Sequence, residues 1–371
     1  MVEYLKASKS DKAEIIDFIN YVFSHDYEPH DFKTLLPKAY SDEVDGLGAE
    51  HYILKEDGRI KAVVACRIAD VDYAGNILKI GFIGSVAVHP YSRGKGYMKK
   101  LMNMAAEDAK KMGVHLLCLT GKRQRYEYFG YENAGIAYNF TISSANIRHA
   151  LADVDADDIS YREMTAKNPD EIRLACRIYN EKPCHTVRYE DEFLRIMHSW
   201  SQKGYAIYKK DEMIGYSIGK SGELVLKDAS YYPAVIKALS DSESTTVPVA
   251  SYERGKISFL SSICENYSIG HIAKICVLDW KAVIYALLSL KSGITVLSDG
   301  EKTLCIDGEC ILISVKNNKV DVLDAVAGKD TKILSHNQAE RALFELDGFL
   351  NNGDYGNWFP LPFYIDSADK F

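Results

Sequence analysis

A glycine-rich, basic loop between a strand and a helix is the feature that most constrains this chain. Residues 80–88 form an apolar run typical of a buried strand, and the apolar residues after Gly96 repeat at the spacing of an amphipathic helix. The loop between them ends in Arg-Gly-Lys-Gly, residues 93–96. Glycines allow successive N–H groups to face one concavity, and a helix start adds free N–H groups and a positive dipole end. The segment therefore predicts an anion site, with a pyrophosphate as its guest.

Other phosphate-binding loops fit less well. The P-loop needs Gly-x4-Gly-Lys-Ser/Thr, which the sequence lacks, and the dinucleotide pattern Gly-x-Gly-x-x-Gly fails because Lys99 takes the third glycine position. An ordinary surface turn remains the alternative.

Length and composition limit the class of protein. A chain of 371 residues is too long for one ordinary core and predicts two or three domains. The net charge of −7 disfavours nucleic-acid binding, which needs clustered basic residues. No secretory signal and no apolar run of about 20 residues are apparent, so we expect a cytoplasmic protein with no membrane partner. None of the eight cysteines forms Cys-x-x-Cys, so neither a zinc site nor a redox pair is indicated.

The order of elements predicts an α+β, or mixed α/β, fold. A helix over 11–24 precedes a hairpin that turns at Asp57-Gly58, and the strand over 80–88 and the helix after it lead to a strand over 114–119. The hairpin sequence that begins at Tyr52 weakly resembles the sequence that begins at Tyr205, which suggests that residues 146–273 are a degenerate second copy of the first domain. The alternative is that hairpins simply look alike.

The last hundred residues predict a small α+β domain. Two helices, over 277–288 and 337–346, flank short strands. The strands are expected over 293–297, 302–306, 310–315 and 319–323. The chain is thus expected to divide into domains at 1–145, 146–273 and 274–371.

The loop and its strand carry a family resemblance. Val-x-Val-x-Pro-x-x-Arg-Gly-x-Gly resembles the acetyl-CoA signature of the GNAT superfamily of N-acetyltransferases. The resemblance implies acetyl-CoA as co-substrate, with the pyrophosphate held by Arg93, Gly94, Lys95, Gly96, Tyr97 and Met98. It also implies that the pantetheine arm pairs with the backbone of Val86, Ala87 and Val88. Met98 departs from the family, which has Gly or Ala there.

A second segment, Arg-Tyr-Glu-Tyr-Phe-Gly-Tyr-Glu from Arg125, resembles the family's Phe-Tyr-x-x-x-Gly-Phe. The shared position is Tyr126, which the resemblance places near the CoA sulfur. A phenol with a pKa near 10 can donate a proton to a leaving thiolate, whose conjugate thiol has a pKa of about 8.5. An aromatic core cluster is the alternative interpretation of these tyrosines.

The three-part layout resembles the enhanced intracellular survival (Eis-like) acetyltransferases: a GNAT domain, a degenerate GNAT-like domain and a sterol-carrier-like domain. That resemblance implies a homohexamer that acetylates cationic, aminoglycoside- or polyamine-like amines. It also implies that the carboxylate of the last residue, Phe371, is the general base. The polar residues 367–370 leave a solvated, frayed tail as the alternative.

Acidic residues gather over 21–50, which in the GNAT fold covers the acceptor side. Asp26 and Glu28 are the candidate substrate-binding residues, although a solvated helix face would look the same. The spacing of these acids and the nearby histidines matches no metal site, so no metal is expected. We therefore expect direct acetyl transfer to a small cationic amine. The alternatives are protein or peptide acetylation, and a catalytically silent acyl-CoA- or lipid-binding protein.

Overall fold

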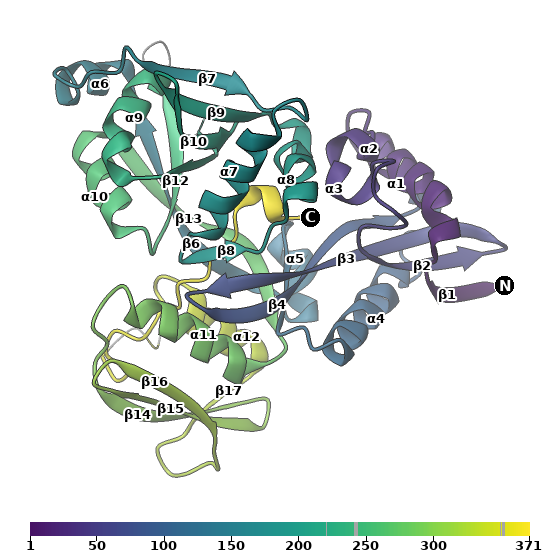
Figure 1. The fold of residues 1–371 in the computed structure, drawn as a ribbon. Coiled ribbons are helices and arrows are strands. Elements are labelled where there is room, and N and C mark those ends of the chain that lie inside the picture. Colours follow the sequence, from purple (N-terminus) through teal and green to yellow (C-terminus); the bar gives the residue numbers. More distant parts are fainter. Residues whose placement is uncertain (220, 241–243, 349, 351–352) are drawn as a thin grey trace. The chain divides into compact units, whose positions relative to one another are not determined.

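The computed structural model describes residues 1–219, 221–240, 244–348, 350 and 353–371. The chain forms two compact units, and each is described by itself. The first contains residues 1–134, 273–361 and 370–371, and the second contains residues 135–272 and 362–369. Both units contain helices packed with strands, which confirms the predicted mixed α+β class (Figure 1). The finer division into three domains stays a prediction.

The main sheet of the first unit has the order β1-β2-β3-β4-β5-β13. Its strands are β1 (Val2–Lys6), β2 (Glu50–Glu56), β3 (Arg59–Tyr73), β4 (Asn76–Val88), β5 (Leu116–Leu119) and β13 (Asn266–Val277), of which the last begins in the second unit. Strands β4 and β5 pair in parallel, and the other neighbouring strands are antiparallel. The expected hairpin is β2–β3, whose turn has φ of 53° at Asp57 and 77° at Gly58.

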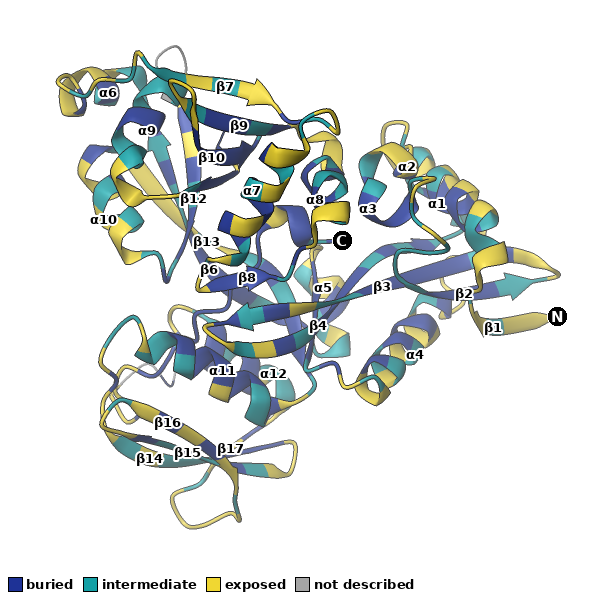
Figure 2. Cartoon of the chain, in the orientation of Figure 1, coloured by how far each residue is buried: buried dark blue, intermediate teal, exposed yellow. Residues whose placement is uncertain are grey.

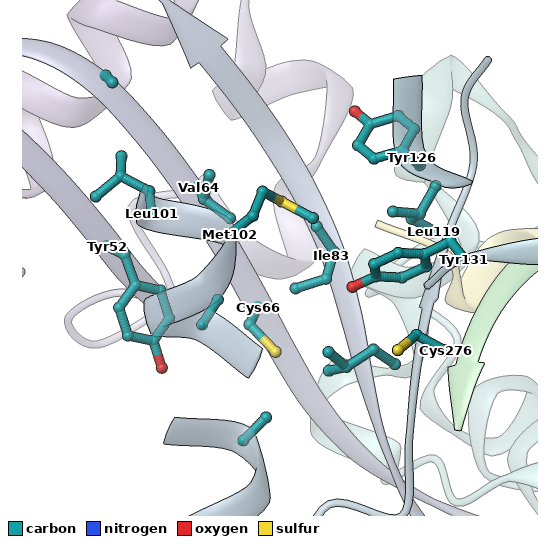
Figure 3. Close-up of a cluster of buried hydrophobic side chains, with 14 of the residues drawn as sticks. Tyr52, Val64, Cys66, Ile83, Leu101, Met102, Leu119, Tyr126, Tyr131 and Cys276 are labelled. Atoms are coloured by element: carbon teal, nitrogen blue, oxygen red, sulfur yellow. The ribbon is translucent and has the colours of Figure 1, made fainter. Parts of the chain in front are cut away.

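Helices cover both faces of this sheet (Figure 1). They are α1 (Lys12–Asp26), α2 (Phe32–Leu35), α3 (Pro37–Tyr40), α4 (Tyr97–Lys111) and α5 (Arg123–Tyr126). Successive strand residues point to opposite faces, so Tyr52 and Leu54 pack under α4 in one cluster with Leu101 (Figure 3). The solvent-facing side of α4 is exposed, as its amphipathic pattern requires (Figure 2).

A smaller sheet in the first unit has the order β16-β15-β14-β17. Its strands are β14 (Gly300–Ile306), β15 (Glu309–Lys316), β16 (Lys319–Asp324) and β17 (Lys332–Leu334), and the helices with them are α11 (Trp280–Ser292) and α12 (His336–Phe344). The strand expected over 293–297 is wrong, because helix α11 runs to Ser292 and the next residues form turns. The helix expected over 277–288 begins later because β13 continues to Val277.

The second unit has a four-stranded antiparallel sheet in the order β11-β10-β9-β7. Its strands are β7 (Ile159–Glu163), β9 (Gly204–Lys209), β10 (Glu212–Ile218) and β11 (Glu223–Leu226). The hairpin expected near Tyr205 is therefore confirmed as β9–β10. Further elements are α6 (Ser144–Ala150), α7 (Pro169–Asn180), β8 (Cys184–Thr186), α8 (Glu190–Met197), α9 (Tyr232–Ser240) and α10 (Arg254–Ile263). Strand β12 (Thr245–Ala250) pairs with β6 (Glu132–Ile142).

Two features bear on the expectations from composition. Within the part of the chain that the structure describes, no helix is both long enough and apolar enough to cross a membrane. Cys305 and Cys310 face each other across the β14–β15 hairpin and form a disulfide. The sequence analysis missed this pair because it looked only for Cys-x-x-Cys, whereas a tight hairpin places two cysteines five residues apart opposite each other.

Candidate functional site

The site begins at a bulge in strand β4. In its pairing with β3, Val63 faces Ala87 and Ala65 faces Gly84, so two residues of β4, Ser85 and Val86, stand opposite one. A bulge bends its strand and leaves backbone groups outside the ladder. The parallel pairing with β5 covers Ile80–Phe82, and β4 continues beyond it to Val88. The end of β4 therefore offers backbone groups to a ligand.

The glycine loop follows directly and leads into α4. Gly94 and Gly96 have φ of 82° and 78°, in the left-handed region that favours glycine. A Cβ added at either glycine would meet no atom within 4 Å, so these glycines serve the backbone conformation and the space beside them is open. Gly96 is the N-cap of α4 and makes no side-chain cap, which leaves the first N–H groups of the helix available. The residues present thus fit a bound pyrophosphate.

A cavity of about 560 Å³ lies at this loop. Its lining includes seven of the nine predicted cofactor-binding residues and one of the two predicted substrate-binding residues. The seven are Val86, Val88, Arg93, Gly94, Gly96, Tyr97 and Met98, and the substrate-binding candidate is Asp26. The rest of the lining is Val22, Phe23, Tyr27, Ser92, Lys99, Arg125 and Phe129. Ala87 is buried on the opposite face of β4, as strand alternation requires. The structure therefore brings most of the predicted cofactor residues to one hollow.

Charges around the cavity are arranged in exposed pairs. Arg93 donates to Asp26, and this guanidinium lowers the pKa of the Asp26 carboxyl. Lys95 donates to Glu56 at 3.1 Å and lies outside the cavity lining. The first of these pairs puts Asp26 at the cofactor loop, so the pairing supports a role in that loop more directly than the predicted role in substrate binding. Glu28 is exposed and lies outside the lining.

Tyr126, at the end of α5, is buried beside the cavity. Its ring packs against Gly121 and stands edge-on to Tyr131 at a centroid distance of 6.2 Å. Figure 3 shows its hydroxyl pointing away from Leu119 and Tyr131. Burial raises the pKa of Tyr126, while the neighbouring Arg125, which lines the cavity, acts to lower it. The phenol is therefore protonated at neutral pH.

Phe371, the last residue, is buried against strand β4. A Cβ added at Gly84 would lie 2.0 Å from Cδ1 and 2.9 Å from the carboxyl carbon of Phe371, so only glycine leaves room for the chain end. The ring of Tyr40 lies at a centroid distance of 6.0 Å, and its hydroxyl is 2.7 Å from Oγ of Ser85 in the bulge. The carboxyl end of the chain thus lies beside the bulge, and the alternative of a frayed tail does not describe it.

The two histidines near the cofactor strands have backbone partners. Nδ1 of His115 accepts from the N–H of Lys79 at 2.9 Å, and Nδ1 of His89 accepts from the N–H of Tyr91 at 3.3 Å. Both rings therefore hold turns or strand ends in place, which favours a structural role for these histidines over a role in proton transfer.

Helix α12 holds the segment that carries Tyr126. The carboxylate of Glu132 accepts from Arg123 at 2.9 Å, from Arg341 at 2.6 Å and from Asn337 at 3.0 Å. Burial opposes ionisation of this group, but these donors lower the pKa of Glu132 to about 2. Residues from the last third of the chain therefore hold Glu132, and Glu132 in turn holds Arg123 at the other end of the segment, which sequence reasoning did not foresee.

Several lining residues were missed from the sequence. Lys99 lies in the first turn of α4 and donates to the hydroxyl of Tyr128, and Arg125 precedes the predicted tyrosine. Both residues lie in motifs that the sequence analysis had identified. A helical projection of α4 would have placed Lys99 near the N-terminus of the helix, next to the glycine loop. Phe23 and Tyr27 come from the end of α1, and no local signal in the sequence links them to the loop.

Comparison with known proteins identifies the domain. Residues 3–134 match the family model of the acetyltransferase (GNAT) domain. Residues 3–134 are therefore a GNAT acetyltransferase domain, and the glycine loop lies within it. No curated protein matches the sequence.

Solved structures share the fold over the whole chain. A probable N-acyltransferase of unknown function from Enterococcus faecalis has 16% identity and a TM-score of 0.70, with 100% of both chains covered. A GCN5-related N-acetyltransferase from Anabaena variabilis has 14% identity and a TM-score of 0.70 over 100% of both chains. Eis1 from Mycobacterium abscessus has 13% identity and a TM-score of 0.65 over 100% of both chains. The resemblance to Eis-like acetyltransferases is therefore confirmed at the level of the fold.

Proposed function

We propose that this enzyme transfers the acetyl group of acetyl-CoA directly to the amino group of a small cationic molecule. The observation that carries the proposal is the cavity at the glycine loop, where Arg93 and the open N-terminus of α4 meet the bulged end of β4. Acetyl-CoA supplies an activated thioester and an anionic pyrophosphate. Backbone N–H groups of residues 94–98 and the Arg93 guanidinium suit the pyrophosphate.

The bulge in β4 suits the reacting end of the cofactor. Backbone N–H groups outside the sheet ladder at Ser85 and Val86 can donate to a thioester carbonyl. Such donors stabilise the negative charge that develops on that oxygen during attack. Val86 lines the cavity, which supports this assignment.

Tyr126 is the proposed general acid. Its raised pKa keeps the hydroxyl protonated, so it can donate to the departing sulfur. Arg125 and Tyr27, whose charges act on Tyr126, both line the cavity, although Tyr126 itself does not. The proposal therefore needs the hydroxyl to act at the cavity margin, and Tyr126→Phe is expected to lower kcat by about 100-fold while CoA affinity changes little.

The carboxylate of Phe371 is the proposed general base. An amine substrate is protonated near neutral pH and must lose a proton before it attacks. An α-carboxyl has a reference pKa of about 3.5. The rings of Tyr40 and Phe371 lie close together at this chain end, and apolar surroundings in general strengthen a carboxylate as a base. A bridging water molecule can carry the proton from the amine of the substrate to the carboxylate of Phe371.

A C-terminal extension tests the base. A few residues added after Phe371 move the carboxylate without deleting a side chain, and turnover is expected to fall almost completely while CoA binding persists. The matched control is Phe371→Leu at the natural length, which keeps the carboxylate and is expected to retain much more activity. Full activity in the extended chain would contradict the proposal.

The acceptor class rests on charge. The chain has a net charge of −7, which favours a cationic partner. A panel of polyamines, aminoglycosides, peptides and neutral amines, assayed for CoA thiol release, tests the class directly. Preference for peptides would support protein acetylation, and no release with any amine would support a silent acyl-CoA-binding protein. The homohexamer remains a prediction that light scattering tests.

A further inference from the structure

Three metal-binding side chains meet in the first unit away from the cavity. Cys276 is near the end of β13, and His336 and Glu340 lie four residues apart on one face of α12. Residues at this spacing share a helix face, so both can point at one partner. Figure 3 shows the sulfur of Cys276 at the edge of the buried cluster, beside Tyr131.

The three side chains have the separations of metal ligands. Sγ of Cys276 is 3.5 Å from Nε2 of His336, and the same nitrogen is 3.2 Å from Oε1 of Glu340. The three ligand atoms all lie within 4.8 Å of one another. Ligand atoms bonded at about 2.0–2.3 Å to a tetrahedral zinc ion lie roughly 3.3–3.8 Å apart. The two measured separations therefore fit a shared ion with little movement.

Neighbouring groups hold two of the three ligands in place. The carboxylate of Glu340 accepts from the N–H groups of Val277 at 2.7 Å and Glu132 at 3.0 Å. Nδ1 of His336 lies 3.6 Å from the carboxylate of Asp307, which is the usual kind of outer partner for a metal-bound imidazole. A Cβ at Gly130 would lie 3.4 Å from Sγ of Cys276, so glycine keeps this side clear.

Charge and access also suit a cation. The Glu340 side chain is fully buried, and a buried carboxylate is favoured by a positive partner. A divalent ion with one thiolate, one carboxylate and a neutral imidazole makes an electrically neutral buried group. The His336 side chain is 22% exposed, which leaves a route for the ion and a place for a water as fourth ligand.

We propose that Cys276, His336 and Glu340 bind a zinc-like divalent metal ion. The mixed sulfur, nitrogen and oxygen ligands favour Zn²⁺ or Co²⁺ over Mg²⁺ or Ca²⁺. The sequence analysis expected no metal because it searched for ligands at known spacings, whereas this set comes from two distant elements. The site is independent of the proposed acetyl transfer.

Metal loading of the full-length protein tests the site. The protein is incubated with Zn²⁺ or Co²⁺, desalted and analysed for bound metal, and about one ion per chain is expected. With Co²⁺, a thiolate-to-cobalt charge-transfer band is expected in the absorption spectrum. Zn²⁺ should also raise the melting temperature, because an ion that binds only the folded state stabilises it.

Two cysteine variants separate a built site from stray binding. Cys276→Ser is expected to lose the charge-transfer band and to bind the ion at least 10-fold more weakly, since removing even an outer partner costs 10–100-fold. Cys264→Ser, at a partly exposed cysteine outside the trio, is expected to behave as wild type. A wild-type protein that retains no ion, or a band that survives in Cys276→Ser, would overturn the proposal.

Discussion

Arg93 in the first unit and Arg188 in the second carry the same charged group in opposite surroundings. The Arg93 side chain is 47% exposed and has one carboxylate partner, Asp26. The Arg188 side chain is 0% exposed and lies between two carboxylates, Glu223 and Asp369. The first arginine is available to a ligand, and the second is fully occupied by the protein itself.

The geometry of Arg188 explains its structural role. It donates to Glu223 at 2.7 and 2.8 Å and to Asp369 at 2.9 Å through two nitrogens. Its guanidinium also stacks over the Tyr179 ring at 3.6 Å, and Tyr179 donates to Asp369 at 2.8 Å. Such a buried network fixes one arrangement, and with the Arg188 side chain 0% exposed a ligand cannot reach the guanidinium. An arginine alone therefore does not make an anion site; its exposure and its neighbouring backbone do.

Substituting the two arginines should have its largest effect on folding stability. Arg188→Met leaves two buried carboxylates without their cation, which should lower the free energy of unfolding by about 3–5 kcal/mol. The same substitution at Arg93 removes only an exposed pair and should cost less than about 1 kcal/mol. Urea unfolding of the two variants measures the difference. Equal losses in both would show that exposure does not separate the two arginines.

The next effect concerns the backbone of the loop. Gly96→Pro fixes φ near −65° where the protein has 78° and removes an N–H, so CoA affinity should fall by more than about 100-fold. Dephospho-CoA keeps the pyrophosphate, so the wild-type protein should still bind it. Titration of the wild-type protein with CoA should give one CoA per chain.

Gly113→Pro is the matched control, because Gly113 follows the other end of α4 with a φ of 71°. It should lose stability but keep CoA affinity. A folded Gly96→Pro protein with unchanged affinity would rule out the loop as the pyrophosphate site.

The local parts of this site could be predicted from the sequence, and the assembled parts could not. The strand, glycine loop and α4 follow one another in the chain, so hydrophobic spacing and turn chemistry were sufficient. The role of Phe371 in the site was expected only from the family resemblance, because the local sequence of residues 367–371 does not indicate that they are buried. Asp369 looks like a solvating residue in sequence, yet its carboxylate is buried because Arg188, 181 residues away, neutralises it.

The last third of the chain shows the same limit. The strands expected over 302–306, 310–315 and 319–323 are confirmed as β14, β15 and β16. Turn residues separate them in the sequence, and Asp307 and Asn317 in these turns have φ of 48° and 50°. The long strand β13 was missed because its first half is polar and exposed, which removes the hydrophobic pattern that marks a strand. Contacts such as those of α12 with Glu132 join residues about 200 positions apart and leave no trace in local pattern.

A smaller effect is expected from the Arg93 side chain alone. Arg93→Met removes one charge-assisted hydrogen bond to the pyrophosphate but leaves the backbone N–H groups, so CoA affinity should fall about 10-fold. Calorimetric titration measures it, and the salt dependence of binding should weaken in the variant. Lys95→Met is the matched control, because Lys95 faces Glu56 outside the cavity lining, and it should change affinity less. A larger loss in Lys95→Met would mean that Lys95 turns toward the ligand.

The smallest effect separates two roles for Asp26. In the structure its carboxylate neutralises Arg93, so Asp26→Asn should free the guanidinium and raise CoA affinity by about 2- to 5-fold, the worth of an exposed ion pair. If Asp26 instead binds the cationic amine, the variant should raise the KM for the amine and leave CoA affinity unchanged. Arg93 lowers the pKa of Asp26, so the carboxylate is ionised above its usual titration range near pH 4. The gain in CoA affinity should therefore be constant between about pH 6 and 8, and should shrink only as acid protonates Asp26 in the wild type. Binding and steady-state kinetics on the same variant give both readouts, with Glu28→Asn as the exposed control. Tighter CoA binding with an unchanged amine KM would assign Asp26 to the cofactor loop, and the reverse result would restore the role expected from the sequence.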